Sequence, residues 1–312
     1  GYRQKVKVAT KSPTWLLYAP EDFDRYLNEQ LERLQTDHID VYLLHALNHE
    51  RWQKLVQMDV LSRAERALAD GRIGHLGFSF HDKFEAFREI VDAYAGWAMC
   101  QIQYNYMNEE EQAGTRGLEY AATKGLAVVV MEPLLGGRLV NPPAAVQAVW
   151  DRAPRRRSPV EWALQWLWNK PQVTLALSGM STMEQVQENI ALAEASATNL
   201  LTAEELAIVA QARDTYRGLC PIPCTNCKYC MPCPNGVDIP RNFAIYNGGI
   251  MYNQEQEARQ AYQQVPEAAR ASACIQCREC EEKCPQKILI SEWMPRVHAV
   301  LGEGQPYSCV QA

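Results

Sequence analysis

The sequence predicts an α/β protein in two parts: a parallel sheet with crossover helices, followed by a small, mainly helical domain that binds metal. Strand-like and helix-like segments alternate through the first two thirds of the chain, which indicates the sheet. Nine of the eleven cysteines lie between Cys220 and Cys284, which indicates the metal-binding part. The composition changes near residue 217, so we expect one domain over residues 1–216 and a second over residues 217–312.

Six strand–helix units follow one another in the first part. Short apolar runs predict the strands, and apolar residues at helical spacing predict the helices between them. The first helix follows Pro20 and carries Phe23, Leu27 and Leu31 along one side. We expect strands at residues 5–11, 39–45, 73–80, 99–104, 126–131 and 173–177, and helices at residues 20–34, 52–69, 83–94, 110–124, 159–168 and 182–195.

Six such units fit either an open doubly wound sheet or most of a closed eight-stranded barrel. In a barrel the strand ends meet at one mouth, where catalytic groups collect. No Gly-x-Gly-x-x-Gly follows a strand, which counts against a doubly wound dinucleotide fold. We therefore expect a partial (β/α)8 TIM barrel with about six of its eight units. Polar side chains stand where the predicted strands end: Lys11, His45, Ser79, Gln101, Glu132 and Ser178.

Composition excludes several classes of partner. The formal net charge is −6 and no sustained basic stripe appears, so we expect no nucleic-acid partner. The apolar runs are far shorter than the ~20 residues of a membrane-spanning helix, so we expect no membrane partner. The first residues have no apolar signal region, and clustered thiols are typical of metal sites in a reducing compartment. Together these features predict a cytoplasmic protein.

Two cysteine runs give the most specific signal in the chain. The second run has the spacing Cys-x2-Cys-x2-Cys-x3-Cys-Pro of a bacterial [4Fe–4S] site, and the first run is one residue shorter before its last cysteine. Zinc is the alternative, because Cys-x2-Cys pairs also suit tetrahedral zinc. Runs of this length before a proline are unusual for zinc, so we expect two [4Fe–4S] clusters, or one if the shortened run is incomplete. The candidate ligands are Cys224, Cys227, Cys230, Cys233, Cys274, Cys277, Cys280 and Cys284.

In ferredoxins with two clusters, the fourth cysteine of each run ligates the other cluster. This arrangement predicts that Cys284 joins the first three cysteines of the first run, and that Cys233 joins the first three of the second run. The alternative is that each run closes its own cluster. Cys220 is left over, and Cys100, within a predicted strand, is expected to pack in the core.

Six short motifs in one order resemble the aldo/keto reductase family. The resemblance covers residues 1–216, and the most similar branch carries a C-terminal iron–sulfur segment. It implies that the protein uses NADP(H) or NAD(H) to reduce a small-molecule carbonyl compound. The motifs are Val8-Ala9-Thr10-Lys11, Asp40-Val41-Tyr42-Leu43-Leu44-His45, Gly77-Phe78-Ser79, Gln101-Ile102-Gln103-Tyr104-Asn105, Met131-Glu132-Pro133-Leu134 and Gln187-Glu188-Asn189.

The family uses a tyrosine as general acid, tuned by a lysine and an aspartate, and a histidine that orients the carbonyl group. Lys11 matches the lysine and His45 the histidine; a nearby ammonium group favours the phenolate form of a tyrosine, whose ordinary pKa is ~10. Tyr2, Tyr18 and Tyr42 do not match the family's tyrosine. We therefore expect the chain to be N-terminally truncated by two units and catalytically inactive without them.

The resemblance also implies a nicotinamide site. Ser79 and Gln101 would hold the carboxamide, Met131 would lie against the ring, and Glu188 and Asn189 would lie on the adenine side. The remaining implied contacts follow the pyrophosphate and the helix N-terminus near residue 182: Leu134, Gly136, Gly137, Gly179, Met180, Ser181 and Gln185. A plain turn at the glycines and a simple N-cap at residues 181–182 are the alternatives.

Three residues depart from the family pattern in this site. Phe80 replaces a common asparagine, and Gly179 and Gln185 stand where a lysine and an arginine commonly bind the 2′-phosphate of NADP. Losing two cations weakens discrimination for a phosphate dianion, so NADP(H) is only weakly preferred over NAD(H).

The two parts differ in their electron chemistry, since a nicotinamide moves two electrons as hydride and each cluster moves one. No flavin motif is present to join them. Either the clusters stabilise the C-terminal part, or a redox protein partner is involved. Three functions follow: a carbonyl reductase with accessory clusters, an electron-transfer protein, or a nicotinamide-binding protein without turnover.

Overall fold

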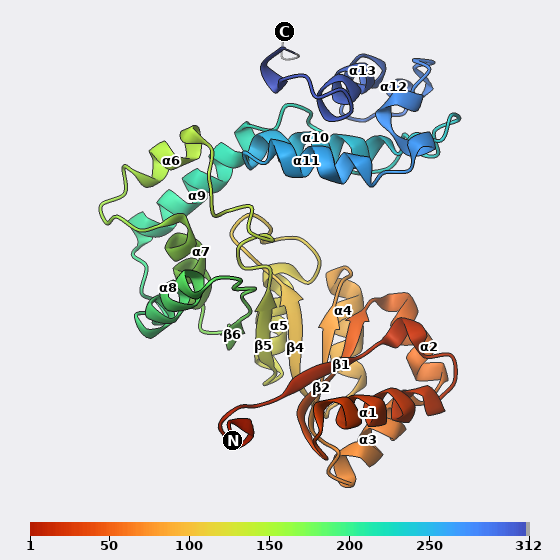
Figure 1. Cartoon of the computed structure of the whole chain (residues 1–312), viewed down its shortest axis with the longest axis vertical. Coiled ribbons are helices and arrows are strands. Elements are labelled where there is room, and N and C mark those ends of the chain that lie inside the picture. Colours follow the sequence, from red (N-terminus) through yellow and green to blue (C-terminus); the bar gives the residue numbers. More distant parts are fainter. Residues whose placement is uncertain (310–312) are drawn as a thin grey trace. The chain divides into compact units, whose positions relative to one another are not determined.

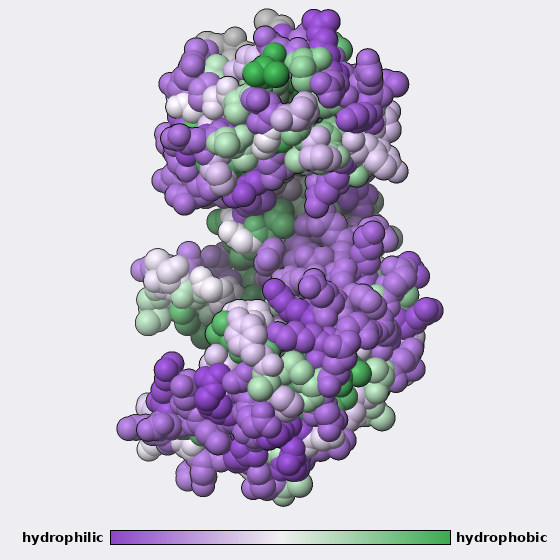
Figure 2. Space-filling model, turned by 90° about the vertical axis from the view of Figure 1, so that its right-hand side faces the viewer, coloured by the Kyte–Doolittle hydropathy of each residue, from purple (hydrophilic) through white to green (hydrophobic). Residues whose placement is uncertain are grey.

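The computed structural model describes residues 1–309 and divides the chain into two compact units. The first unit comprises Gly1–Gly137 and Val160–Thr202, and the second comprises Arg138–Pro159 and the chain from Ala203 onward. The domain boundary expected after residue 216 falls inside helix α9 (Ala203–Gly218), which belongs to the second unit. The face drawn in Figure 2 is mainly hydrophilic with separate hydrophobic areas, as is usual for a folded chain.

The first unit is built on a six-stranded parallel sheet whose order in space is its order in sequence (Figure 1). A doubly wound sheet would reverse this order at a switch point, whereas a β/α barrel keeps it. The expected barrel-type order of six strands is therefore confirmed. The strands are β1 (Ala9–Ser12), β2 (Ile39–Leu47), β3 (Ile73–Phe80), β4 (Trp97–Gln103), β5 (Ala127–Met131) and β6 (Leu175–Ala176).

Helices join these strands, as the apolar spacing predicts. The predicted helix at residues 52–69 is wrong in one respect: it is two helices, because Asp59 takes a left-handed conformation (φ 50°) that ends the first of them. The helices of this unit are α1 (Glu21–Leu34), α2 (His49–Gln57), α3 (Val60–Ala69), α4 (Phe84–Ala93), α5 (Gly114–Thr123), α7 (Pro159–Trp168, with Pro159 from the second unit) and α8 (Met183–Glu194).

The first and last strands are shorter than predicted. Pairing of β1 with β2 starts at Ala9 opposite Val41, and residues 3–5 form a 3-10 turn, so the alternating stretch before Ala9 is not strand. β6 has two residues, although Thr174 and Leu177 also donate backbone hydrogen bonds to the β5 carbonyl groups of Val128 and Val130.

The second unit is mainly helical, as predicted. Helix α10 packs against α11 and α13, and Figure 1 shows α10 and α11 side by side. Phe243 and Tyr246 from α10, Tyr262 from α11 and Met294 from α13 are fully buried in its core. The bounds of its helices are α6 (Ala144–Trp150), α9 (Ala203–Gly218), α10 (Ile239–Met251), α11 (Glu255–Gln263), α12 (Glu279–Glu282) and α13 (Ile290–Leu301).

The strand β3 is buried along most of its length and lies between β2 and β4, with α3 packed against it. Phe78 is fully buried, with its ring 5.8 Å from that of Phe87 and 4.9 Å from that of Trp97. We expect Phe78→Ala to lower the free energy of unfolding of this unit by about 3–5 kcal/mol in urea titrations, because it leaves a cavity.

Leu34→Ala is the control for that change, because Leu34 is 48% exposed at the end of α1. It should cost less than about 1 kcal/mol. Equal losses in the two variants would contradict the placement of Phe78 in the core.

Candidate active-site mouth and cysteine-lined cavities

Lys11 and His45 lie near each other at the ends of neighbouring strands. Lys11 pairs in register with Leu43, and His45 follows two residues later on β2. The His45 ring lies 4.9 Å from the ring of Trp15, and the His45 carbonyl accepts a 2.6 Å hydrogen bond from Thr14 Oγ1. The structure therefore brings together the two residues that the sequence singles out as catalytic.

The surroundings of His45 disfavour its charged form. Partial burial lowers the pKa of His45 below its usual value of 6.5, and the positive charge of Lys11 adds to this effect, followed by His81 and Arg51. The imidazole is therefore neutral at neutral pH. A neutral ring can donate one hydrogen bond and accept another, which suits a group that orients a carbonyl oxygen.

Ser79, Gln101 and Met131 form a row across the ends of β3, β4 and β5. Ser79 and Gln101 are register partners and are almost fully buried. Gln101 Nε2 donates to Met131 Sδ over 3.4 Å, and Ser79 Oγ accepts a 2.7 Å hydrogen bond from the amide of Ala46. The row thus places two polar side chains and a thioether on the strands that follow the His45 strand in the sheet. Met131 stands where the aldo/keto reductase family often has an aromatic ring.

The segment after β5 forms a turn rather than continuing the strand. The amide of Gly137 donates to the Leu134 carbonyl over 2.9 Å, and Gly136 and Gly137 have φ values of 66° and 89°. Nothing lies within 4 Å of a Cβ added to either glycine. The turn conformation therefore explains these glycines, and the space beside them is open.

The N-terminus of α8 is capped by its own residues. Thr182 Oγ1 accepts a hydrogen bond from the Gln185 amide, and Gln185 Oε1 accepts from the amides of Ser181 and Thr182. Gly179, Met180 and Ser181 are exposed before this cap. The N-cap alternative is thus present in the structure, and a phosphate group at this helix end would have to displace the Gln185 side chain.

Glu188 and Asn189, the two residues expected on the adenine side of the nicotinamide site, follow each other on α8. Asn189 Nδ2 donates to Ser178 Oγ over 3.0 Å, which joins the helix to the loop after β6. Glu188 precedes it and is exposed.

The three tyrosines near the start of the chain have their rings in other environments. The Tyr2 ring faces Lys5 Nζ at 5.5 Å, and the Tyr18 ring faces Lys54 Nζ at 4.9 Å. Tyr42 is buried edge-on against Phe23 of α1. Burial raises the pKa of Tyr42 well above its usual value, so its hydroxyl group is a poor proton donor.

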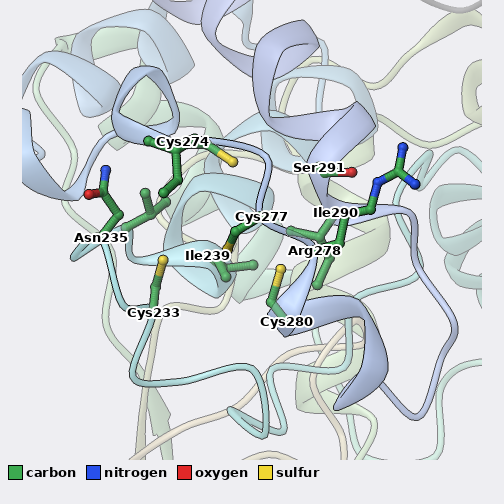
Figure 3. A pocket seen from close by; sticks show the side chains of 11 residues that line it. Cys233, Asn235, Ile239, Cys274, Cys277, Arg278, Cys280, Ile290 and Ser291 are labelled. Carbon is green, nitrogen blue, oxygen red and sulfur yellow. The ribbon is translucent and has the colours of Figure 1, made fainter.

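Two cavities in the second unit are each lined by four cysteines. In one cavity Cys284 joins the first three cysteines of the first run. In the other, drawn in Figure 3, Cys233 joins the first three cysteines of the second run. Figure 3 shows the sulfur atoms around the second cavity pointing toward one another from different segments. The first set is Cys224, Cys227, Cys230 and Cys284, and the second set is Cys233, Cys274, Cys277 and Cys280.

The two cavities are neighbours. Ile239, at the start of α10, and Ile290, at the start of α13, line both of them. These cysteines are free thiols. Within residues 1–309, no three His, Cys, Asp or Glu side chains converge closely enough to hold a single metal ion.

The loops that carry the cysteines repeat one backbone geometry. Asn226 and Gln276 have φ values of 54° and 57°, and Lys228 and Arg278, each directly after the second cysteine of a run, have 64° and 66°. These left-handed residues turn backbone amides toward the cysteine sulfur atoms, and the amide of Gln276 donates to Cys274 Sγ over 3.4 Å. The cysteine spacing does not reveal this repeat, since only Asn226 is a residue that favours a left-handed conformation.

Burial opposes ionisation of the cysteines. It raises the pKa of the Cys280 thiol to about 11, and it also raises the pKa of Cys224, Cys230 and Cys274. Amide donors act in the opposite sense at these sulfur atoms. A thiolate ligand therefore needs positive charge in the cavity, which iron supplies, and the donor set fits a thiolate-bound cluster.

The other two cysteines with described side chains serve different purposes. Cys100 is fully buried in β4, and burial raises its pKa to about 12, as expected for core packing. Cys220 Sγ donates to the Ile222 carbonyl over 3.3 Å and lines neither cavity.

Comparisons with known proteins find two separate matches, one for each part of the chain. Residues 1–214 match the aldo/keto reductase family model, and residues 223–289 match the model of a 4Fe-4S dicluster domain. The chain therefore belongs to the aldo/keto reductase family and carries an iron–sulfur domain after it. In residues 1–309, no helix is both long and apolar enough to cross a membrane.

Several curated relatives share the first part of the chain. An oxidoreductase of Schizosaccharomyces pombe is 26% identical over 172 residues, which are 55% of this chain and 53% of that protein. L-galactose dehydrogenase of Arabidopsis thaliana is 23% identical over 188 residues, which are 56% of this chain and 58% of that protein. Methylglyoxal reductase YeaE of Escherichia coli is 26% identical over 225 residues, which are 70% of this chain and 73% of that protein. The chain thus spans little more than half the length of the first of these relatives.

Solved structures support the fold. An aldo-keto reductase from Bacillus halodurans superposes with a TM-score of 0.56 at 23% identity, covering 68% of this chain and 73% of that one. A thermostable aldo-keto reductase gives a TM-score of 0.55 at 24% identity, covering 67% and 72%.

We expect the His45 imidazole to titrate below pH 6.5 in NMR measurements, and Lys11→Met to raise its pKa only part of the way to 6.5, because burial is the larger cause. Since its folded pKa lies below its unfolded value, the stability that this group contributes is complete above pH 6.5 and falls as the pH drops toward the folded pKa. Lys54→Met, a change at the lysine over the Tyr18 ring, is the control and should not move the titration. A wild-type pKa at or above 6.5 would contradict this electrostatic arrangement.

Proposed function

We propose that the protein is an oxidoreductase of the aldo/keto reductase type, which uses NADP(H) or NAD(H) to reduce a small-molecule carbonyl group and carries two [4Fe–4S] clusters as an electron-transfer part. The barrel part would be residues 1–216 and the iron–sulfur part residues 217–312. The observation that carries the proposal is that Lys11 and His45 lie near each other toward the ends of β1 and β2. The next three strands carry Ser79, Gln101 and Met131 at their own ends, beside this pair in the sheet.

The residues of the mouth divide this work. His45, held neutral, would orient the carbonyl oxygen, and the Lys11 ammonium would stabilise negative charge that develops there. Ser79 and Gln101 would hold the carboxamide, with Met131 against the ring. When bound, the nicotinamide would supply a hydride to the carbonyl carbon. The oxygen would take its proton from the tyrosine that the family uses as general acid, a role that none of Tyr2, Tyr18 and Tyr42 matches.

The other end of the dinucleotide would follow the open side of the turn after β5 and the loop before α8. The pyrophosphate contacts would come from Leu134, Gly136 and Gly137, and the far end from Gly179, Met180, Ser181, Gln185, Glu188 and Asn189. No cation stands at Gly179 or Gln185, and Gln185 occupies the helix N-terminus. Both observations favour similar affinities for NADPH and NADH.

A second candidate function is electron transfer without carbonyl reduction. It is favoured by the two cavities lined by four cysteines each, because iron–sulfur clusters held by such thiolates carry single electrons. In that case the mouth would bind a nicotinamide without turnover and the clusters would carry the activity. Free thiols in this number suit a reducing compartment, and we place the protein in the cytoplasm.

Binding and turnover distinguish the two functions. We expect NADPH and NADH to quench the protein's tryptophan fluorescence with Kd values within about tenfold of each other, a difference of about 1.4 kcal/mol. In the product of the complete gene, oxidation of either one with methylglyoxal, slowed ~100-fold or more in Lys11→Met, supports carbonyl reduction. Binding without turnover in that protein supports the second candidate, and absence of binding contradicts both.

The eight cysteines that line the two cavities would be the cluster ligands, each cluster taking its fourth cysteine from the other run. This crossed ligation is supported by the two sets of lining residues and by the repeated loop geometry. Four thiols around a cavity also suit a cluster better than zinc, which needs its four sulfur atoms about 2.3 Å from one point.

Crossed ligation predicts an unusual mutational pattern. Protein purified without oxygen should hold about eight irons and absorb broadly near ~400 nm. In a background where Cys274, Cys277 and Cys280 are alanine, only the first cluster can form. There Cys284→Ala should remove the remaining iron, whereas Cys233→Ala should leave it.

Cys220→Ala is the matched control in that background, because this thiol lines neither cavity. It should leave the iron content unchanged. If Cys233→Ala instead removes the iron and Cys284→Ala leaves it, each run closes its own cluster.

A further inference from the structure

The two cysteine runs present the same kind of edge to solvent. In each run the second cysteine, Cys227 or Cys277, is exposed, while the third is buried. Each run also exposes one large apolar side chain: Tyr229, two residues after the exposed cysteine, is 66% exposed, and Ile275, two residues before it, is 67% exposed. The two edges share their backbone geometry and an exposed cysteine, and they differ in charge.

That charge differs in sign between the two runs. Between its first and last cysteines, the first run carries a single charged side chain, the exposed Lys228. The second run has a net charge of −1 over the same stretch, from Arg278, Glu279, Glu281, Glu282 and Lys283. The chain as a whole is acidic, so a locally basic edge runs against its composition.

The basic edge continues along α10. Beside Cys224 lies a surface hollow of about 270 Å³, lined by Lys228, Asp238 and Arg241. Arg241 and Ala244 also line a second hollow of about 200 Å³, whose other charged residues are Arg138 and Glu257. The Asp238 side chain accepts a hydrogen bond from the Arg241 amide as the cap of α10.

Three cations thus face two carboxylates along these adjoining hollows, and one of those carboxylates is engaged in capping. Small residues keep the second hollow open, since Gly248, Gly249 and Ala261 line it between α10 and α11. Arg138 lies over the Tyr252 ring at 5.6 Å, which places its charged group beside this surface. The cations are spread over two hollows, which suits an extended acidic surface better than one small anion.

We propose that this basic face, made of Lys228, Arg241 and Arg138, is the docking surface for a small acidic protein that carries one electron. The inference rests on the proposed function, because it requires the cluster ligated by Cys224 and Cys227. One electron passes from the reduced carrier to that oxidised cluster, so the carrier is oxidised and the cluster is reduced by the same electron. Complementary charge speeds such encounters.

The internal repeat supplies a matched control for the test. Lys228→Glu/Arg241→Glu reverses two charges on the basic face, and Arg278→Glu/Lys283→Glu reverses two charges at the other run. Lys228 and Arg278 occupy equivalent left-handed positions, so the two variants impose the same backbone demand there. Both change the net charge of the chain by the same amount.

The probe is a plant-type [2Fe–2S] ferredoxin, an acidic one-electron carrier. We expect the basic-face variant to bind it about 10-fold or more weakly at low salt, and to lose the salt dependence that the wild-type protein shows. Stopped-flow reduction of the clusters at ~400 nm should slow in parallel. The Arg278→Glu/Lys283→Glu protein should behave like the wild type in both measurements.

Two outcomes would overturn the proposal. One is equal weakening in both variants, and the other is wild-type binding that is absent or independent of salt. Failure of the proposed function looks different, because the visible absorption of the clusters would then be missing from every variant before any carrier is added.

Discussion

The second unit depends on a constraint between two cysteine runs that lie about fifty residues apart in the sequence. Each four-cysteine cavity is complete only when the Cys-Pro end of one run reaches the cavity of the other, so neither half of this unit can form its site alone. The helices α10 and α11 are the arm that makes this exchange, since they connect the two runs and pack against each other. Ile239 and Ile290 begin α10 and α13 and line both cavities. The positions of the cysteines therefore depend on how α10 and α11 pack, because these helices connect the two runs.

The first unit obeys a simpler constraint. A parallel sheet in sequential order sends every strand end to the same edge, so residues far apart in the chain arrive beside one another without any local motif. Lys11 and His45 meet in this way, and the row from Ser79 to Met131 extends their surface. Partial burial, and after it the positive charge of Lys11, lowers the pKa of His45, so the imidazole is neutral and can both donate and accept a hydrogen bond.

Sequence reasoning was strongest where spacing determines structure. The parallel sheet followed from six alternating units, and its sequential order from the polar residues at the strand ends and from the lack of a Gly-x-Gly-x-x-Gly after any strand. The exchange of Cys233 and Cys284 between cavities followed from the pattern of two-cluster ferredoxins. It was weaker where a single backbone conformation decides the outcome. Asp59 divides a predicted helix, and Lys228 and Arg278 take left-handed conformations that their residue types do not favour. The cap at α8 shows a third limit: Gln185 resembled a ligand position, but its side chain satisfies the helix end itself. Such choices depend on tertiary contacts and local hydrogen bonds that no periodicity records.

The central claim is that two clusters share their ligands across the two runs. Anomalous diffraction at the iron absorption edge, on crystals of the protein grown without oxygen, tests it most directly. The account predicts two separate iron clusters beside Ile239 and Ile290, the first bonded to Cys284 together with Cys224, Cys227 and Cys230, and the second bonded to Cys233 together with the other three cysteines. A single cluster, a zinc signal in place of iron, or a cluster ligated by four cysteines of one run would contradict it.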